Sequence, residues 1–210
     1  MSNTLKSILV ALTILVVDQV VKIIVKTNMT LYEQIPILGN WGIIHFVENK
    51  GMAFGLHLPG DYGKIILSIF RLLASAAIIL YIRHLIIIKA HSGLIITLSM
   101  ILAGAMGNIF DSAFYGLIFT ESTPFAAAKM FPEGGGYASF LHGNVVDMFY
   151  FPILKGNYPD WLMGGKSFIF FRPVFNVADS SISIGVFIIL FNQKRFFSHL
   201  ADGSEQKKPA

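Results

Sequence analysis

Long apolar runs alternate with more polar stretches along the chain, and four of these runs are long enough to cross a membrane as helices. A spanning helix needs about 20 mainly apolar residues at a rise of about 1.5 Å per residue. The runs that meet this requirement lie at about 5–25, 64–88, 92–110 and 177–197. They predict a mainly α-helical membrane protein with four transmembrane helices.

The first run could also be a cleaved signal peptide. Its apolar stretch is longer than the h-region of about 7–15 residues that signal peptides have. It has no small-residue cleavage site, and it contains Asp18 and Lys22. We therefore expect the first run to be retained as a membrane helix.

The stretches between the apolar runs differ in character. Short apolar runs at 35–47 are interrupted by Pro36, Gly39 and Gly42, which favours strands and turns and predicts a small extracytoplasmic β-sheet. The segment 111–176 is long and contains glycine clusters at 134–136 and 164–165, which predict short helices and mobile loops.

The chain shows no fixed-period repeat, and one membrane domain over residues 1–200 accounts for nearly all of it. The remaining residues, 201–210, are polar and are expected to form a disordered cytoplasmic tail.

Composition supports the membrane interpretation. Of the 210 residues, 54% are hydrophobic and only 13% are charged, which is too apolar for an ordinary soluble domain. The chain has no cysteine, so disulfides, thiolate metal sites and a cysteine nucleophile are excluded. The formal net charge of +4 comes from bases that are dispersed and mostly flank apolar runs, which indicates a membrane and not a nucleic-acid partner.

The positions of the basic residues predict the orientation. With four spans, most of them fall on one side of the membrane: Lys6, Arg83, Lys89, Lys194, Arg195, Lys207 and Lys208. Short loops rich in Lys and Arg stay in the cytoplasm. Both termini are therefore expected to be cytoplasmic, and the segments 26–63 and 111–176 are expected to face outward.

Polar side chains gather at the predicted outer ends of the spans. A charged residue within a span costs about 2.5–3.5 kcal/mol, so each one suggests a function. The residues are Asp18, Asn108, Asp111, Asn176 and Asp179, joined from the outer segments by Asn49 and Asp147. We expect a site of carboxylates and carboxamides near the outer membrane surface.

Each of these residues also has a purely structural interpretation. Asp18 and Lys22 are four residues apart on one helix face and can simply form an ion pair. Asp111 can bond backbone groups at a helix end, and Asp179 can cap the helix that follows it. His142 has the properties of an ordinary surface or hydrogen-bonded histidine.

The sequence contains none of the common motifs of other catalytic types that we considered. There is no His-Glu-x-x-His zinc motif, no Gly-x-Ser-x-Gly elbow and no phosphate-binding loop, so we expect neither a metal nor an organic cofactor. Paired aspartates remain as the acid and base. Two carboxyl groups that share a site cannot easily both ionise, so one stays protonated while the other activates water.

Five segments, in order along almost the whole chain, resemble the motifs of lipoprotein signal peptidase, also called signal peptidase II. They are DQVVK at 18–22, ENKGMAFG at 48–55, GAMGNIFD at 104–111, GNVVDM at 143–148 and FNVAD at 175–179. Each motif alone is weak evidence, but five in order on the predicted spans are specific.

The resemblance implies that Asp147 and Asp179 form a catalytic dyad. It further implies that Asp111 supports the dyad, and that other motif residues bind substrate or support the site: Asn49, Gly51, Asn108, Asn176, Asp18 and Lys22. The implied reaction is hydrolysis of diacylglyceryl-modified prolipoproteins before the lipidated cysteine, in the bacterial inner membrane near its outer leaflet. Membrane lipids are implied partners, and globomycin-type cyclic peptides are implied inhibitors.

The chain departs from this family in two respects. The family usually has Arg directly after the third-motif aspartate, whereas this chain has Ser112, and Arg172 is a candidate substitute. The stretches from Asp111 to Asp147 and from Asp147 to Asp179 are longer than usual, which predicts additional outer structure.

Two other function classes stay open at this point. A small transporter or assembly protein could bind cargo with the same polar cluster, although the spans look continuous and the acids lie toward one side. Another kind of intramembrane aspartyl protease would keep the dyad and change the substrate, but the presenilin-like motif pair is missing from the sequence.

Overall fold

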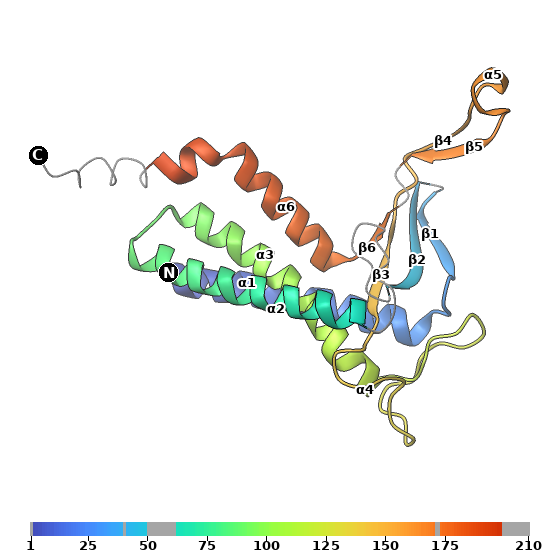
Figure 1. Cartoon of the computed structure of the whole chain (residues 1–210), viewed down its shortest axis with the longest axis horizontal. Coiled ribbons are helices and arrows are strands. Elements are labelled where there is room, and N and C mark those ends of the chain that lie inside the picture. Colours follow the sequence, from blue (N-terminus) through green and yellow to red (C-terminus); the bar gives the residue numbers. More distant parts are fainter. Residues whose placement is uncertain (1, 40, 50–61, 171–172, 199–210) are drawn as a thin grey trace, which may run out of the picture.

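The structure, a computed structural model, describes residues 2–39, 41–49, 62–170 and 173–198. Long helices lie along one axis of the molecule, and a sheet stands at one end of them (Figure 1). The elements, in chain order, are α1 Asn3–Asn28, β1 Gln34–Leu38, β2 Gly42–Asn49, α2 Tyr62–Ile87, α3 Ser92–Phe110, the π-helical turn η1 Asp111–Tyr115, α4 Gly116–Ile118, β3 Val145–Tyr150, β4 Leu154–Asn157, α5 Asp160–Met163, β5 Ser167–Phe170, β6 Val174–Phe175 and α6 Val177–Phe191.

The helices fall close to the predicted spans. Among the described residues, three helical stretches are long and apolar enough to cross a membrane: Asn3–Asn28, Ile65–Ile87 and Ser92–Ile118. The predicted fourth span corresponds to α6, which is apolar but has only 15 residues before a turn at Asn192 and a further helical turn to residue 198. The membrane fold is thus confirmed, whereas the count of four spans stays a prediction.

The outward faces of the helices are apolar. Along α1, for example, Leu5, Leu12, Val16 and Ile24 each expose about half of their surface. Such a face would be unfavourable in water, but lipid tails are as apolar as these side chains. The exterior of the bundle is therefore suited to a bilayer.

The helix α3 lies at the centre of the bundle and packs against α1, α2 and α6. Glycines permit its closest contacts. A Cβ atom on Gly104 would lie 2.3 Å from the carbonyl oxygen of Ala178, and one on Gly107 would lie 2.6 Å from the Asp18 carboxylate. Small residues of this kind let helix backbones approach closely within a membrane.

The predicted sheet is present and is larger than the first outer segment alone. Four antiparallel strands lie in the order β1-β2-β3-β6. The strand β3 pairs with β2 in a register that places Asp147 opposite Val47. The sheet thereby carries one of the predicted catalytic residues toward the helices.

The second outer segment differs from the expected helices and loops, because it also supplies strands. Its strands β4 and β5 form a separate hairpin around the short helix α5, which extends beyond the main sheet (Figure 1). The glycines of the second cluster fit this turn, since Gly164 and Gly165 have φ angles of 62° and 71°. A left-handed conformation of this kind favours glycine.

A buried polar cluster attaches the long connection between η1 and β3 to the rest of the fold. The Lys26 ammonium, at the end of α1, forms an ion pair with Glu48 and donates to the Ser122 hydroxyl at 2.8 Å. The Asn144 amide donates to the other Glu48 oxygen at 2.7 Å. This cluster explains how an enlarged outer segment stays close to the bundle.

Candidate active site

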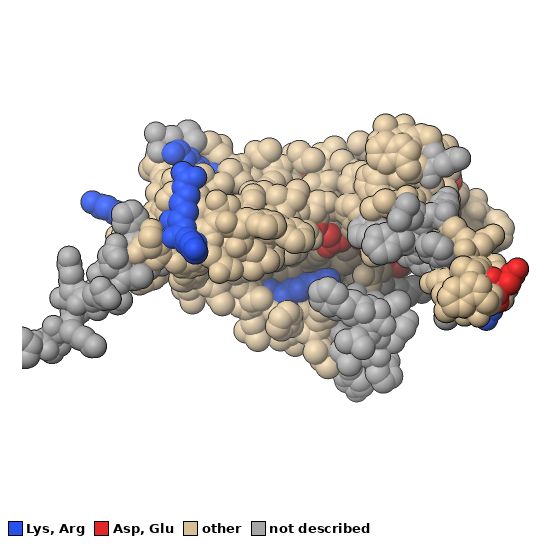
Figure 2. All heavy atoms as spheres, turned by 90° about the horizontal axis from the view of Figure 1, so that it is seen from above, with Lys and Arg blue, Asp and Glu red and all other residues tan. Residues whose placement is uncertain are grey.

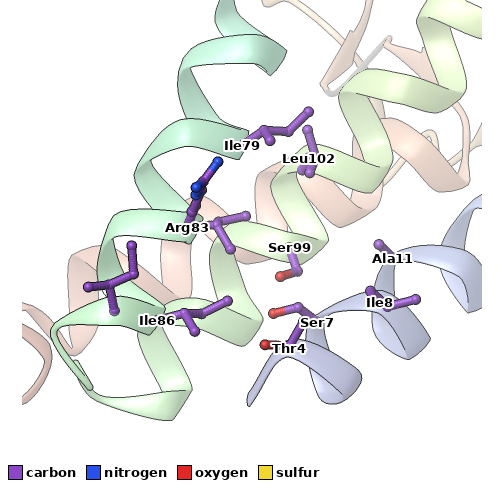
Figure 3. A pocket seen from close by; sticks show the side chains of 11 residues that line it. Thr4, Ser7, Ile8, Ala11, Ile79, Arg83, Ile86, Ser99 and Leu102 are labelled. Carbon is purple, nitrogen blue, oxygen red and sulfur yellow. The ribbon is translucent and has the colours of Figure 1, made fainter. Parts of the chain in front are cut away.

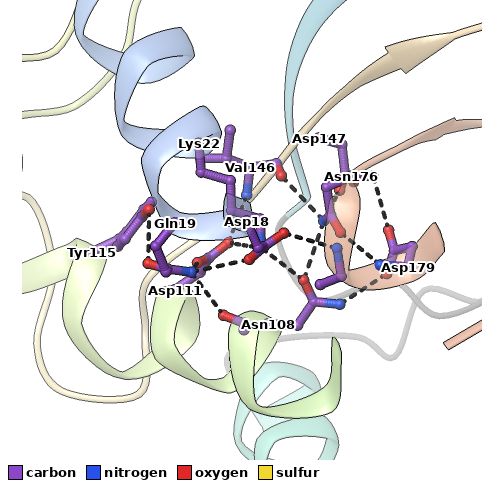
Figure 4. Close-up of polar contacts among 12 residues, drawn as sticks. Asp18, Gln19, Lys22, Asn108, Asp111, Tyr115, Val146, Asp147, Asn176 and Asp179 are labelled. Carbon is purple, nitrogen blue, oxygen red and sulfur yellow. Dashed lines mark hydrogen bonds and ion pairs between the residues drawn. The ribbon is translucent and has the colours of Figure 1, made fainter. Parts of the chain in front are cut away.

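The polar residues at the sheet end of the bundle meet in one connected network (Figure 4). They come from α1, from the junction of α3 with η1, from β3 and from the start of α6. Both predicted dyad residues belong to this network. The expected gathering of carboxylates and carboxamides at one end of the helices is therefore what the structure shows.

Asp179 occupies the first turn of α6, where it takes part in a capping box. The Asn176 side chain accepts from the Asp179 N–H at 2.8 Å, and the Asn176 N–H donates to Asp179 Oδ2 at 3.4 Å. Its other oxygen, Oδ1, accepts from the Asn108 amide at 2.8 Å. Asp179 is thus a helix cap that also faces the centre of the site.

Asp147 lies on β3 with 6% of its surface exposed. Its Oδ1 accepts from the Asn176 amide nitrogen at 2.7 Å, and that nitrogen also lies 3.1 Å from Asn108 Oδ1. Two carboxamides, Asn108 and Asn176, therefore connect the carboxylates of Asp147 and Asp179. This arrangement fixes the orientation of both acids.

The surroundings of Asp147 favour its protonated form. Burial raises its pKa to about 8, and the negative charge of Asp179 acts in the same direction. At neutral pH, Asp147 is therefore mostly a neutral acid that can donate a proton. A protonated carboxyl group beside a second carboxylate is the catalytic arrangement of an aspartic peptidase.

A buried ion-pair cluster lies beside the dyad. The Lys22 ammonium is 2.9 Å from Asp18 and 2.8 Å from Asp111, and all three side chains are almost completely buried. The same ammonium donates to Asn108 Oδ1 at 3.0 Å. Asp18 and Lys22 thus form the intrahelical pair of the structural interpretation, and Lys22 also supports the carboxamide that holds Asp179.

Asp111 begins a π-helical turn, a feature that is frequent at functional sites. It accepts from the Gln19 amide at 2.9 Å and from the Val146 N–H at 3.2 Å. The second bond connects Asp111 to the residue that precedes Asp147. Its contacts are therefore those of a residue that positions the dyad strand.

The described residues contain no group of three or more His, Cys, Asp or Glu side chains that could hold a metal ion. The acids of the site are instead bonded to amides, to a lysine and to backbone N–H groups. The chemistry that these residues offer is acid and base catalysis by carboxyl groups.

The family model of signal peptidase II matches residues 10–195, which is most of the chain. The chain belongs to the signal peptidase II family. It is 49% identical to the lipoprotein signal peptidase of Porphyromonas gingivalis over 195 residues, which cover 91% of this chain and 84% of that protein. It is 36% identical to the lipoprotein signal peptidase of Amoebophilus asiaticus over 189 residues, which cover 88% and 76% of the two chains.

A solved structure shares this fold. A bacterial membrane enzyme determined by the in meso method at 1.9 Å resolution is 25% identical and superposes with a TM-score of 0.56. The match covers 89% of this chain and 91% of that one. It supports the arrangement of several apolar helices and a small antiparallel sheet.

Some of the other residues that the sequence analysis named lie within the described part of the signal peptidase II fold, and others do not. Asn49 ends β2 and pairs in register with Val145, two residues before Asp147. Gly51, Arg172 and the polar tail at 201–210 lie outside the described residues. His142 lies within 3.0 Å of the Ser139 hydroxyl and 2.9 Å of a backbone carbonyl in the outer segment, as its structural interpretation predicts.

Ser112, the first of the two departures from the family motifs, is buried and donates to the Asn108 carbonyl oxygen at 3.0 Å. That oxygen is one helical turn back along the chain. The hydroxyl is therefore engaged with its own helix and provides no charge to the site.

The sequence analysis did not identify two residues that lie near the site. Gln19, inside the first motif, donates to Asp111 and accepts from the Tyr115 hydroxyl at 3.1 Å. Arg71 of α2 interacts electrostatically with Asp179 most strongly, and also with Asp111 and Asp147. A cation inside a span was the available signal for Arg71, because such residues mark functional sites.

Proposed function

We propose that this chain is an aspartic endopeptidase that removes the signal peptide from diacylglyceryl-modified prolipoproteins, with cleavage before the lipidated cysteine. Membership of the signal peptidase II family supports the activity. One observation supports the choice of Asp147 and Asp179 as the catalytic residues. Two carboxamides connect their carboxyl groups, and the surroundings of Asp147 keep it protonated.

The buried, protonated state of Asp147 supports a different role for each acid in this proposal. The proton on Asp147 is donated to the oxygen of the scissile carbonyl, while Asp179 takes a proton from the attacking water. The water oxygen bonds to the carbonyl carbon and forms a tetrahedral intermediate. The C–N bond then breaks as Asp179 returns its proton to the leaving nitrogen and Asp147 regains one from the intermediate's hydroxyl.

The other residues of the network act as supports in this proposal. Asn108 and Asn176 orient the dyad, and Asp18, Lys22 and Asp111 hold the helices and β3 in register. Asn49 and Gly51 bind substrate or support the site in this proposal, by resemblance to the family motif. Cyclic peptides of the globomycin type are the corresponding inhibitors.

The proposed setting is the bacterial inner membrane, with four spans formed by α1, α2, α3 with its extension, and α6. Lys and Arg side chains gather at the end of the bundle away from the sheet (Figure 2). Because basic flanks stay in the cytoplasm, that end and both termini are placed there. The dyad then lies near the outer leaflet, within one membrane domain over residues 1–200.

Cleavage of a purified lipidated prolipoprotein, compared with its unlipidated form, tests this proposal. We expect cleavage of the lipidated form only, at the bond before the modified cysteine. Equal cleavage of both forms would indicate an intramembrane protease of different specificity, and binding without cleavage would favour the transport or assembly class.

A further inference from the structure

A groove lies between α1 and α2 at the end of the bundle opposite the dyad. Both helices pack on α3 but make almost no backbone contact with each other over their described residues, so α3 forms the floor of the space between them. The groove has a volume of about 350 Å³. Figure 3 shows the side chains of the three helices that line it. This volume falls within the range of about 300–1,000 Å³ that is typical of small-molecule sites.

The walls of the groove are mainly apolar and open to the surrounding bilayer. Ile8 and Ala11 come from α1, Ile79 from α2, and Leu102 from α3. Ile8 and Ile79 expose about half of their surface, so the groove can be reached from between the helices. In a membrane, a crevice of this kind is accessible to acyl chains.

The lining of the groove includes the polar side chains of Thr4, Ser7, Ser99 and Arg83, and the proposal concerns Ser7 and Arg83. The Ser7 hydroxyl is buried, with 8% of the residue exposed, and it has no hydrogen-bond partner among the described residues. Arg83 is exposed on the rim and forms no ion pair within the described part of the chain. The groove thus offers an unpaired cation and an unsatisfied hydroxyl to whatever occupies it.

The position of Arg83 relative to the bilayer indicates what that occupant is. It lies four residues before the end of the span Ile65–Ile87, which corresponds to about 6 Å along the helix. Figure 3 shows the Arg83 guanidinium directed toward Ile79, and the side chain is long enough to turn toward the headgroup layer, while the apolar walls lie deeper in the hydrocarbon. The matching ligand has an anionic head and an apolar tail.

We propose that the groove binds an anionic glycerophospholipid. One acyl chain lies between α1 and α2, the phosphate pairs with Arg83, and the Ser7 hydroxyl donates to an ester oxygen. Basic pockets between transmembrane helices bind acidic lipid headgroups for this reason, and an arginine fork suits the phosphate geometry. The site is independent of Asp147 and Asp179.

Native mass spectrometry of the purified full chain, titrated with phosphatidylglycerol or phosphatidylcholine, tests the proposal. The unaltered protein should bind phosphatidylglycerol more tightly. Arg83→Gln should lower that affinity about fivefold and leave binding of phosphatidylcholine unchanged, because one basic side chain near the headgroups contributes about 1 kcal/mol.

Arg195→Gln is the matched control, since it removes the same charge from an exposed position at the same end of the bundle but outside the groove. It should keep the preference for phosphatidylglycerol. Ala11→Phe, which fills the groove, should weaken binding of both lipids. Equal losses in the two arginine variants, or no preference in the unaltered protein, would overturn the proposal even if Ala11→Phe failed to fold.

Discussion

Replacement of Lys22 by Met is expected to destabilise the fold strongly. The Lys22 ammonium is fully buried, with Asp18 at 2.9 Å and Asp111 at 2.8 Å. Methionine fills a similar volume but leaves two buried carboxylates without a cation. Removal of one partner from a buried ion pair typically costs about 3–5 kcal/mol, because the other charge loses both solvent and counter-ion.

For a chain of this length, about 1 kcal/mol corresponds to a shift of about 2–4 °C in Tm, so the loss should be about 6–20 °C. Thermal unfolding of the detergent-solubilised protein, followed by tryptophan fluorescence, measures it. Lys129→Met is the control, because it removes the same charge from an exposed position and should shift Tm by less than about 2 °C.

The double variant Lys22→Met with Asp111→Asn separates charge from packing. Neutralising one of the two carboxylates that lost their cation should recover part of the lost Tm. The Tm changes of the two substitutions should therefore not be additive. A Lys22→Met protein as stable as Lys129→Met would refute the reasoning. It would mean that the ion-pair cluster of Asp18, Lys22 and Asp111 does not stabilise the fold.

Three further outcomes concern activity. Turnover should fall as pH rises through about 8, because the pKa of Asp147 lies there and only the protonated carboxyl can donate to the carbonyl oxygen. A pH–rate profile that stays flat to pH 10 would contradict this. Ser112→Ala should keep most turnover and lose about 1 kcal/mol of stability, since among the described residues its hydroxyl bonds the Asn108 carbonyl alone. A loss of turnover as large as that of a dyad variant would place Ser112 in the site. Arg71→Gln should lower kcat/KM about tenfold with little change in Tm, because it removes a cation whose field acts on Asp179; unchanged kinetics would show that this field is not used.

The helices could be predicted well from the sequence because their signal is local. The predicted limits of the third span, 92–110, coincide with α3, and the first two differ from α1 and α2 by three residues or fewer. A sustained apolar run of about 20 residues leaves few alternatives in a bilayer. The continuation of α3 through η1 and α4 was missed, since the polar Asp111 looked like a helix end.

The strand that carries Asp147 could not be predicted in the same way. The register pairs Asp147 with Val47, 100 residues away, and such a non-local pairing leaves no periodic signal in either segment. Six residues of β3 are also too short to distinguish a buried strand from a loop by pattern alone. The motif located the residue, but only the fold shows which element holds it.

The members of the site could be predicted more fully than their connections. Polar residues inside spans are costly, so Asp18, Lys22 and Asn108 could be identified from position alone. The bridging role of Asn176 depends on side-chain directions, which the sequence does not contain. Arg71 was missed because its relevance depends on the rotation of α2, whereas the candidate substitute for the missing Arg, Arg172, lies outside the described residues.

In the proposed mechanism, Asp147 and Asp179 together perform the hydrolysis. The most direct test measures turnover of a lipidated prolipoprotein by Asp147→Asn, Asp179→Asn and the double variant, with Tm and membrane insertion followed in parallel. An amide has nearly the shape of a carboxyl group but cannot cycle between acid and base, so each single variant should lose at least about 10³-fold in turnover, and the double variant little more. The Tm of Asp147→Asn should stay close to that of the unaltered protein. Near-normal turnover in either single variant, with the fold intact, would contradict the claim.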